Sequence, residues 1–96
     1  MNYFITAIYD EPGIFYYRKA RRTFGYFNNL DDAFKAVEEN RGSMQECLYN
    51  YLVIEGIDEG IHPIVNKEYW YKWDDGKWML CNKPEFLKSI INFALG

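Results

Sequence analysis

The chain has 96 residues, of which 49% are hydrophobic and 26% are charged, and its net charge is −3. This balance excludes an intrinsically disordered chain, and the length predicts a single domain over residues 1–96. The mild negative charge disfavours nucleic-acid binding, because non-specific affinity for nucleic acids comes from neutralising phosphates. Since the sequence shows neither a signal peptide nor an apolar run of membrane-spanning length, we expect a cytoplasmic protein with no membrane partner.

The first 27 residues predict three antiparallel strands. Residues 3–9 are β-branched and aromatic, and the turn-forming residues 10–13 (DEPG) follow them. A second strand is expected at about 14–19 and a third at about 21–27. Strict alternation along the third strand would turn one set of side chains to one face (Arg22, Phe24, Tyr26) and another set to the other (Arg21, Thr23, Gly25, Phe27).

An amphipathic helix is predicted at about 30–40. Asn29 is a suitable N-cap with a carboxylate three residues later, and apolar residues recur at the helical spacing (Leu30, Ala33, Phe34, Val37). Residues 40–42 (NRG) end this helix, with Gly42 available for a left-handed cap. The pattern of residues 43–46 (SMQE) then predicts a short helical turn.

The second half of the chain predicts three more strands and a second helix. Residues 48–57 are apolar on both faces near their middle, which indicates a central strand. Residues 68–73 and 77–82 form a predicted hairpin around a three-residue loop, 74–76 (DDG), whose glycine is left-handed. Pro84 suits the first turn of a helix over 84–95, which carries an apolar stripe (Leu87, Ile90, Ile91, Ala94) widened by Phe86 and Phe93.

Together these elements predict an α+β fold: an antiparallel sheet of five to six strands with two main helices, about 30–40 and 84–95, on one face. In this arrangement the opposite face of the sheet carries aromatic side chains that need a lid or a second copy of the protein. Because symmetric dimers are the commonest assemblies, we expect a homo-oligomer.

Aromatic residues make up 20% of the chain and gather in runs such as 15–17 (FYY) and 69–71 (YWY). A domain of this size buries only about 60–65% of the surface that its unfolded chain exposes. Several rings are therefore expected in a groove or at an interface. The sequence thus predicts a binding surface.

Residues that perform catalysis or bind metals are scarce. The single histidine, His62, stands before a proline and suits either a structural role or a contact to a ligand or partner. Two isolated cysteines, Cys47 and Cys81, cannot complete a zinc site, and the acidic pairs lack the spacing of a calcium loop. We therefore expect no metal, no cofactor, no catalytic residue and no enzymatic activity.

Basic residues cluster at one point, where Arg18, Lys19, Arg21 and Arg22 occupy four of five positions. One interpretation is a site for an anion, since guanidinium groups match phosphate oxygens. The other is an edge strand that is protected by charge against further pairing. Aromatic rings beside such a strand would suit a nucleotide, with the base stacked on a ring.

Several segments resemble a family of small phage and prophage proteins, and their order covers most of the chain: residues 22–27 (RTFGYF), 49–55 (YNYLVIE), 59–63 (EGIHP), 70–73 (WYKW) and 92–96 (NFALG). The named group that they resemble is the first family of Thoeris anti-defence proteins. Members of that family are sponges that bind cyclic ADP-ribose isomers, the immune signals of the bacterial Thoeris system, without cleaving them.

The resemblance implies a homo-oligomer in the cytoplasm of a bacterial host cell, with aromatic residues on adenine and Arg or Asn on phosphate or ribose. The residues of this chain that match that chemistry form the expected ligand site: Arg21, Arg22, Phe24, Trp70, Trp73, Asn92 and Phe93. Two alternatives remain. One is a small inhibitor that binds a host or defence protein through an aromatic patch, as anti-CRISPR proteins do, or an interaction module of another kind; the other is an enzyme acting on a nucleotide or sugar.

Overall fold

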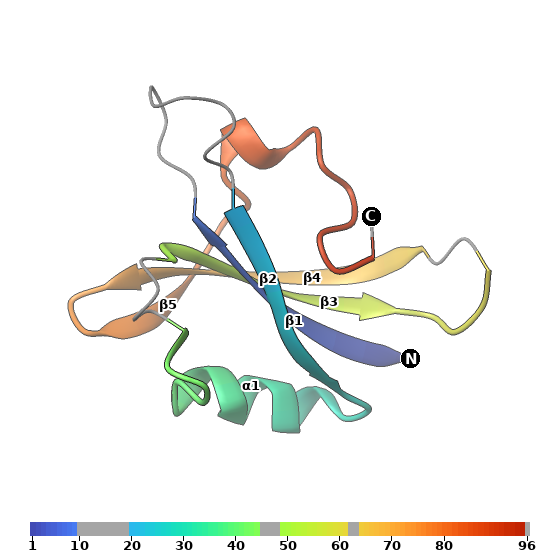
Figure 1. Cartoon of the computed structure of the whole chain (residues 1–96), viewed down its shortest axis with the longest axis horizontal. Helices are drawn as coiled ribbons and strands as arrows, with labels where there is room; N and C mark the ends of the chain where they lie inside the picture. The colour runs from blue at the N-terminus through green and yellow to red at the C-terminus, as the bar shows by residue number, and fades with distance from the viewer. Residues whose placement is uncertain (10–19, 45–48, 62–63, 96) are drawn as a thin grey trace.

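The computed structural model describes residues 1–9, 20–44, 49–61 and 64–95. These residues form an antiparallel sheet of five strands in the order β2-β1-β3-β4-β5 (Figure 1). The strands are β1 (Asn2–Tyr9), β2 (Ala20–Phe27), β3 (Tyr51–Ile57), β4 (Val65–Asp74) and β5 (Lys77–Cys81). This confirms the predicted α+β class and the central place of the third of these strands. The strand expected at 14–19 and His62 lie outside the described residues, as do residues 45 and 46 of the turn expected at 43–46.

The helix α1 (Leu30–Glu38) confirms the first predicted helix. Asn29 caps it, since its Oδ1 accepts the backbone N–H groups of Asp31 at 2.8 Å and Asp32 at 3.3 Å. At the other end, the N–H of Arg41 donates to the carbonyl of Ala36 and that of Asn40 to the carbonyl of Val37. Asn40, at φ 48°, thus takes the left-handed cap position that the sequence assigned to a glycine.

Strand β2 departs from the predicted alternation because it contains a bulge. Ile5 of β1 is paired with Gly25 and Thr6 with Thr23, which leaves Phe24 as the extra residue. The bulge places Phe24 and Arg22 on the face covered by α1, while Tyr26 pairs with Phe4 on the other face. The expectation that Arg22, Phe24 and Tyr26 share one face was therefore wrong.

The hairpin between β4 and β5 is tighter than predicted. Asp74 pairs with Lys77, so the loop contains two residues in place of three. Both loop residues are left-handed, Asp75 at φ 50° and Gly76 at φ 81°. This is the turn geometry that matches the twist of paired strands, and an Asp-Gly sequence favours it.

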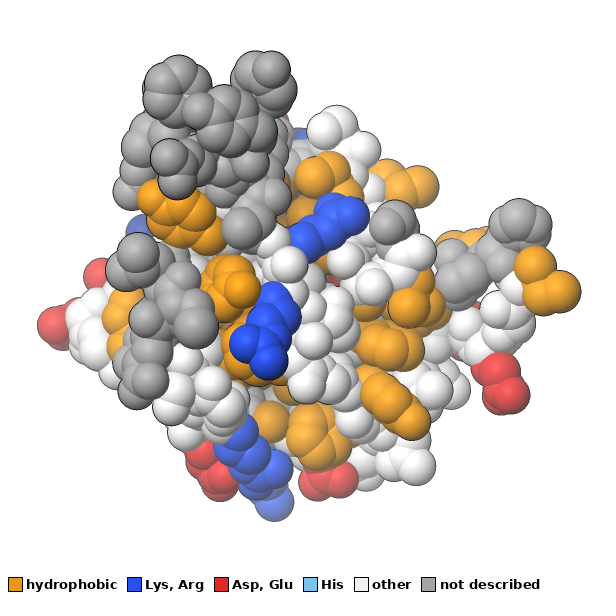
Figure 2. Space-filling model, viewed as in Figure 1, with side chains coloured by type: hydrophobic (Ala, Val, Ile, Leu, Met, Phe, Trp, Pro, Cys, Tyr) orange, Lys and Arg blue, Asp and Glu red, His pale blue; other side chains and the backbone are white. Residues whose placement is uncertain are grey.

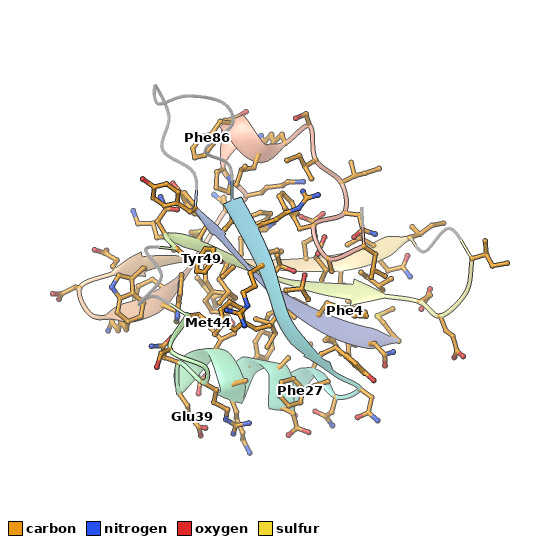
Figure 3. All side chains as sticks on the ribbon, in the orientation of Figure 1. Phe4, Phe27, Glu39, Met44, Tyr49 and Phe86 are labelled. Atoms are coloured by element: carbon orange, nitrogen blue, oxygen red, sulfur yellow. The ribbon has the colours of Figure 1, made fainter. Side chains whose placement is uncertain are left out.

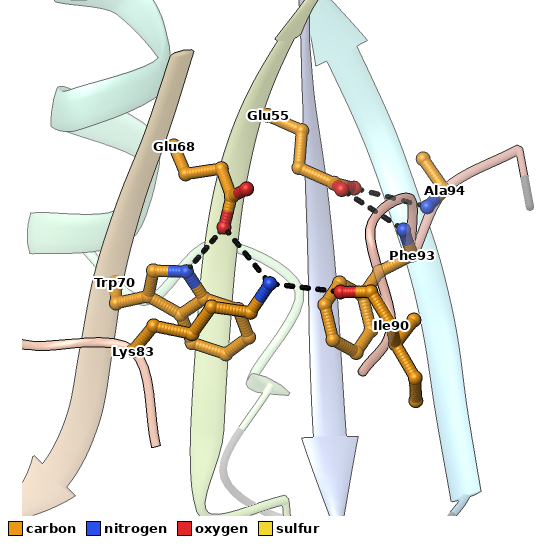
Figure 4. A network of polar contacts seen from close by, with 7 residues as sticks. All are labelled: Glu55, Glu68, Trp70, Lys83, Ile90, Phe93 and Ala94. Atoms are coloured by element: carbon orange, nitrogen blue, oxygen red, sulfur yellow. Dashed lines mark hydrogen bonds and ion pairs between the residues drawn. The ribbon is translucent and has the colours of Figure 1, made fainter. Parts of the chain in front are cut away.

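The second predicted helix, 84–95, does not form. Only a 3₁₀ turn, Glu85–Leu87 (η3), is present, and residues 88–95 are irregular. In an α-helix the N–H of Ala94 would donate to the carbonyl of Ile90. Instead the carboxylate of Glu55 accepts the N–H of Ala94, and the ammonium of Lys83 donates to the Ile90 carbonyl at 2.8 Å (Figure 4). Side chains from other parts of the fold, Glu55 and Lys83, therefore bond to backbone groups that a helix would pair with each other.

The C-terminal segment also lies on the other side of the sheet from α1 (Figure 1), and not on the same face as predicted. Under α1 the core contains Ile5, Leu52, Ile54 and Tyr71, which pack against Ala33, Ala36 and Val37 of the helix. On the opposite face Ile8, Val53 and Trp70 pack against Leu87 and Phe93. The lid that the sequence suggested for this face is part of the chain itself.

The N-cap of α1 supplies a direct test of its local stability. We expect Asn29→Ala to lower the free energy of unfolding by about 1 kcal/mol, because two backbone N–H groups lose their acceptor. Urea unfolding of Asn28→Ala is the matched control, since Asn28 is exposed and adjacent. Equal effects of the two substitutions would show that the cap contributes nothing.

Candidate functional site

A groove lies between the edge strand β2 and the loop that follows α1, with a volume of about 220 Å³. Its wall is mainly apolar, and a single charged residue reaches it. The lining residues are Ile5, Phe24, Gly25, Tyr26, Phe27, Ala36, Arg41, Gly42 and Met44. Figure 3 shows Phe27 and Met44 on the α1 side of the sheet and Phe86 on the far side.

The bulge of β2 and the loop after α1 shape this groove together. The bulge turns Phe24 toward the helix side, where its ring meets the edge of Tyr49 at a centroid distance of 6.0 Å. Gly42 has φ +76°, and a Cβ atom there would lie 3.3 Å from Cδ2 of Phe24. A glycine therefore lets the loop approach the Phe24 ring closely in a left-handed conformation.

One guanidinium group, that of Arg41, belongs to the groove wall, and a second, that of Arg22, lies beside it over the Phe24 ring. The guanidinium carbon of Arg22 lies 4.8 Å from the centroid of the Phe24 ring, a cation–π distance. Arg41 forms an ion pair with Glu39, Nε to Oε1 at 2.7 Å, and their side chains are 51% and 57% exposed. Ion pairs this exposed contribute at most about 1 kcal/mol, so Arg41 can exchange this partner for a ligand at low cost. Figure 2 shows basic side chains bordered by hydrophobic ones on this side of the molecule.

The seven predicted site residues do not meet in one place. Arg22 and Phe24 lie together at the groove. Trp73 packs on Trp78 on the same face of the sheet, with ring centroids 5.2 Å apart. The other predicted residues lie on the opposite face. There Arg21 lies over Phe93 at 5.8 Å, Trp70 packs against Phe93, and Asn92 accepts the backbone N–H of Leu95.

Trp70 and Phe93 are core residues in this structure. They are only 4% and 3% exposed, and their rings meet edge to face at 5.2 Å. The indole N–H of Trp70 donates to Oε1 of Glu68 at 2.8 Å. Neither ring offers an open face for stacking a base in this arrangement. Arg22 and Phe24 are therefore the predicted residues that best fit a ligand contact.

Two potential nucleophiles among the described residues, Cys81 and Tyr71, have raised pKa values. Burial raises the pKa of the Cys81 thiol, an effect that the charge of Lys72 partly offsets, so this thiol stays protonated and weakly nucleophilic. Burial, with a smaller contribution from Glu38, raises the pKa of Tyr71 to about 12. Within the described ranges no three His, Cys, Asp or Glu side chains are grouped to hold a metal ion. No helix in those ranges is both long and apolar enough to cross a membrane.

Sequence reasoning missed Arg41, Gly42 and Met44 as groove residues, and it missed Glu55 entirely. Arg41 and Gly42 were interpreted only as the end of a helix and Met44 as part of the helical turn that follows, and no local pattern shows that this loop faces β2. Glu55 did carry a signal, because a carboxylate within a strand that is apolar on both faces must be buried. It is fully buried and accepts the N–H groups of Phe93 at 2.9 Å and Ala94 at 3.0 Å.

Comparison of the chain with protein-family models, curated proteins and solved structures gives no match.

The burial of Trp70 has a measurable consequence. We expect Trp70→Ala to lower the free energy of unfolding by about 3–5 kcal/mol, because it leaves a cavity beneath Phe93. Leu80→Ala is the control, since Leu80 is 68% exposed and should change stability by about 0.5 kcal/mol or less. A Trp70→Ala protein as stable as the control in chemical denaturation would show that this ring is not part of the core.

Proposed function

We propose that this protein binds a small aromatic anion of the nucleotide class in the groove between β2 and α1 and holds it without converting it. The observation that carries the proposal is the placement of the Arg22 guanidinium over the Phe24 ring at an apolar groove. A flat base needs apolar and aromatic walls, and a phosphate needs guanidinium donors. Both kinds of group occur at this groove.

The size of the groove limits how the ligand would sit. Its volume of about 220 Å³ is smaller than the roughly 300 Å³ at which sites for drug-sized ligands begin. It would therefore enclose one base, with the sugar and phosphates at the rim. Arg41 lines the groove and Arg22 lies beside it, over the Phe24 ring; both are exposed and would pair with the phosphates.

Sequestration is favoured over catalysis because the described residues offer no activated nucleophile at the groove. The cysteine and the tyrosine whose pKa values are raised, Cys81 and Tyr71, stay protonated near neutral pH. The resemblance to Thoeris anti-defence proteins makes cyclic ADP-ribose isomers the first ligands to test, and an anti-defence sponge in a phage-infected cell the corresponding biological role. Homo-oligomerisation belongs to that role, and light scattering of the purified protein measures it.

Thermal-shift and calorimetric titrations test the ligand class. The panel contains cyclic ADP-ribose isomers, cyclic di- and trinucleotides, AMP, and adenosine as the uncharged control. A ligand at a hundred times its Kd stabilises the fold by about 2.7 kcal/mol, which a thermal shift detects readily. Binding of an anionic member but not of adenosine is the expected result. If every member of the panel leaves the melting temperature unchanged, the proposal fails; recovery of a converted product would contradict the non-enzymatic part.

Substitutions of Arg22 and Arg21 distinguish ligand binding in the groove from ligand binding on the opposite face of the sheet. We expect Arg22→Ala to weaken ligand binding about 10- to 100-fold, since a hydrogen bond to a charged group contributes about 1.5–3 kcal/mol. Arg22→Lys should recover part of the affinity, because it keeps the charge but loses the planar fork. Arg21→Ala, on the opposite face, should bind the ligand as the unmodified protein does. Calorimetry in which Arg21→Ala is the weaker binder would place the ligand on the other face.

A second candidate is a protein-binding inhibitor. It is favoured by the edge strand β5, where Met79 and Leu80 are 41% and 68% exposed. An exposed apolar edge strand is a surface to which another chain can add a strand. In that case Leu80→Lys would abolish co-purification with a host protein and leave nucleotide binding unchanged.

A further inference from the structure

Residues 85–95, here called the strap, cross the sheet face opposite α1 with few backbone hydrogen bonds of their own. The described bonds are those of consecutive turns: Leu87 N–H to the Pro84 carbonyl, Lys88 N–H to that of Glu85, and Ile90 N–H to that of Leu87. A further bond joins the Leu95 N–H to Oδ1 of Asn92. No strand pairing ties these residues to the sheet, so side chains hold the strap in place.

The main polar group that holds the strap on the sheet is the carboxylate of Glu55, on the central strand β3. It is fully buried, and its two oxygens accept the consecutive N–H groups of Phe93 and Ala94 at 2.9 and 3.0 Å (Figure 4). A second tie is the bond from Lys83 Nζ to the Ile90 carbonyl, and Lys83 also lies 3.6 Å from Glu68. Beside these bonds, Phe93 packs on Trp70.

We propose that the strap opens as one unit while the sheet stays folded, and that the Glu55 carboxylate controls how often it opens. Opening would release Leu87 and Phe93 and uncover Ile8, Val53 and Trp70, which form the apolar core on this face. The strap therefore covers an apolar and aromatic surface that is exposed only in the open state. This inference concerns the face opposite the groove and does not depend on the proposed ligand.

The charges around Glu55 determine how opening responds to pH. Burial raises the pKa of Glu55 above its usual range, and the neighbouring carboxylate of Glu68 on β4 adds to this effect. The N–H groups of Phe93 and Ala94 and the ammonium of Lys83 lower it in part. From β2, the guanidinium of Arg21 lies over the Phe93 ring. The net direction is a raised pKa in the closed state.

In the open state water reaches Glu55, so its carboxyl titrates near its usual pKa. The closed state then binds more protons than the open state between these two pKa values. The preference for closure is complete below the usual pKa and is lost as the pH rises through the raised one. Higher pH should therefore favour the open strap.

Amide hydrogen exchange measured by NMR tests this inference on the full chain, from about pH 4 to about pH 9, a range that covers usual and raised glutamate pKa values. We expect the protection factors of the Phe93 and Ala94 amides to fall together as the pH rises, by at most about tenfold per pH unit, the limit for one proton. The amides of β1 and β3 should keep their higher protection throughout. Equal protection of the strap and the central strands at every pH would overturn the proposal.

The substitution Glu55→Gln tests whether Glu55 causes the pH dependence of strap opening. The substituted side chain is uncharged and carries no titrating proton, so strap protection should be independent of pH. Glu59→Gln makes the same chemical change in the exposed turn after β3 and should leave the profile of the unmodified protein unchanged. Persistence of the pH dependence in Glu55→Gln would exclude Glu55 as the controlling group. Should that variant fail to fold, the profile of the unmodified chain decides the question.

Discussion

A five-stranded sheet with two apolar faces and one helix must cover its second face with something, and here the chain uses its own C-terminal segment. Burying that face requires backbone N–H groups to be satisfied without a helix or a further strand. The Glu55 carboxylate does this for Phe93 and Ala94. Because Glu55 lies on the central strand, its position is set by the sheet, and its carboxylate in turn positions the strap and places Phe93 against Trp70 of β4.

Because the C-terminal segment covers this face, the aromatic residues of the chain need a different interpretation. Surplus ring surface suggested a binding face or a second subunit, yet Trp70, Tyr71, Trp78 and Phe93 are buried within one chain. Most other described rings are half-buried and pack against the two cores. The argument for an oligomer based on an uncovered face therefore loses its premise. What remains is a smaller and more specific feature, the groove where Phe24 and Arg22 meet.

The groove itself depends on a local irregularity. Without the bulge in β2, Phe24 would follow the alternation of the strand, and the groove would lose the Phe24 ring and the cation above it. Bulges re-aim side chains in this way, often beside functional sites. The left-handed Gly42 completes the wall from the loop after α1, so two backbone features far apart in sequence create one site.

Sequence patterns alone determined the strands of the sheet, the capped helix α1 and the central place of β3, because short-range periodicity and caps encode them. The tertiary structure decided the bulge in β2, the contact of Arg22 with Phe24, and the irregular conformation of residues 84–95. Those residues have the apolar spacing of a helix, but Glu55 and Lys83 take the backbone groups that a helix would pair internally. Groups distant in sequence compete for these bonds, and local patterns carry no information about such competition.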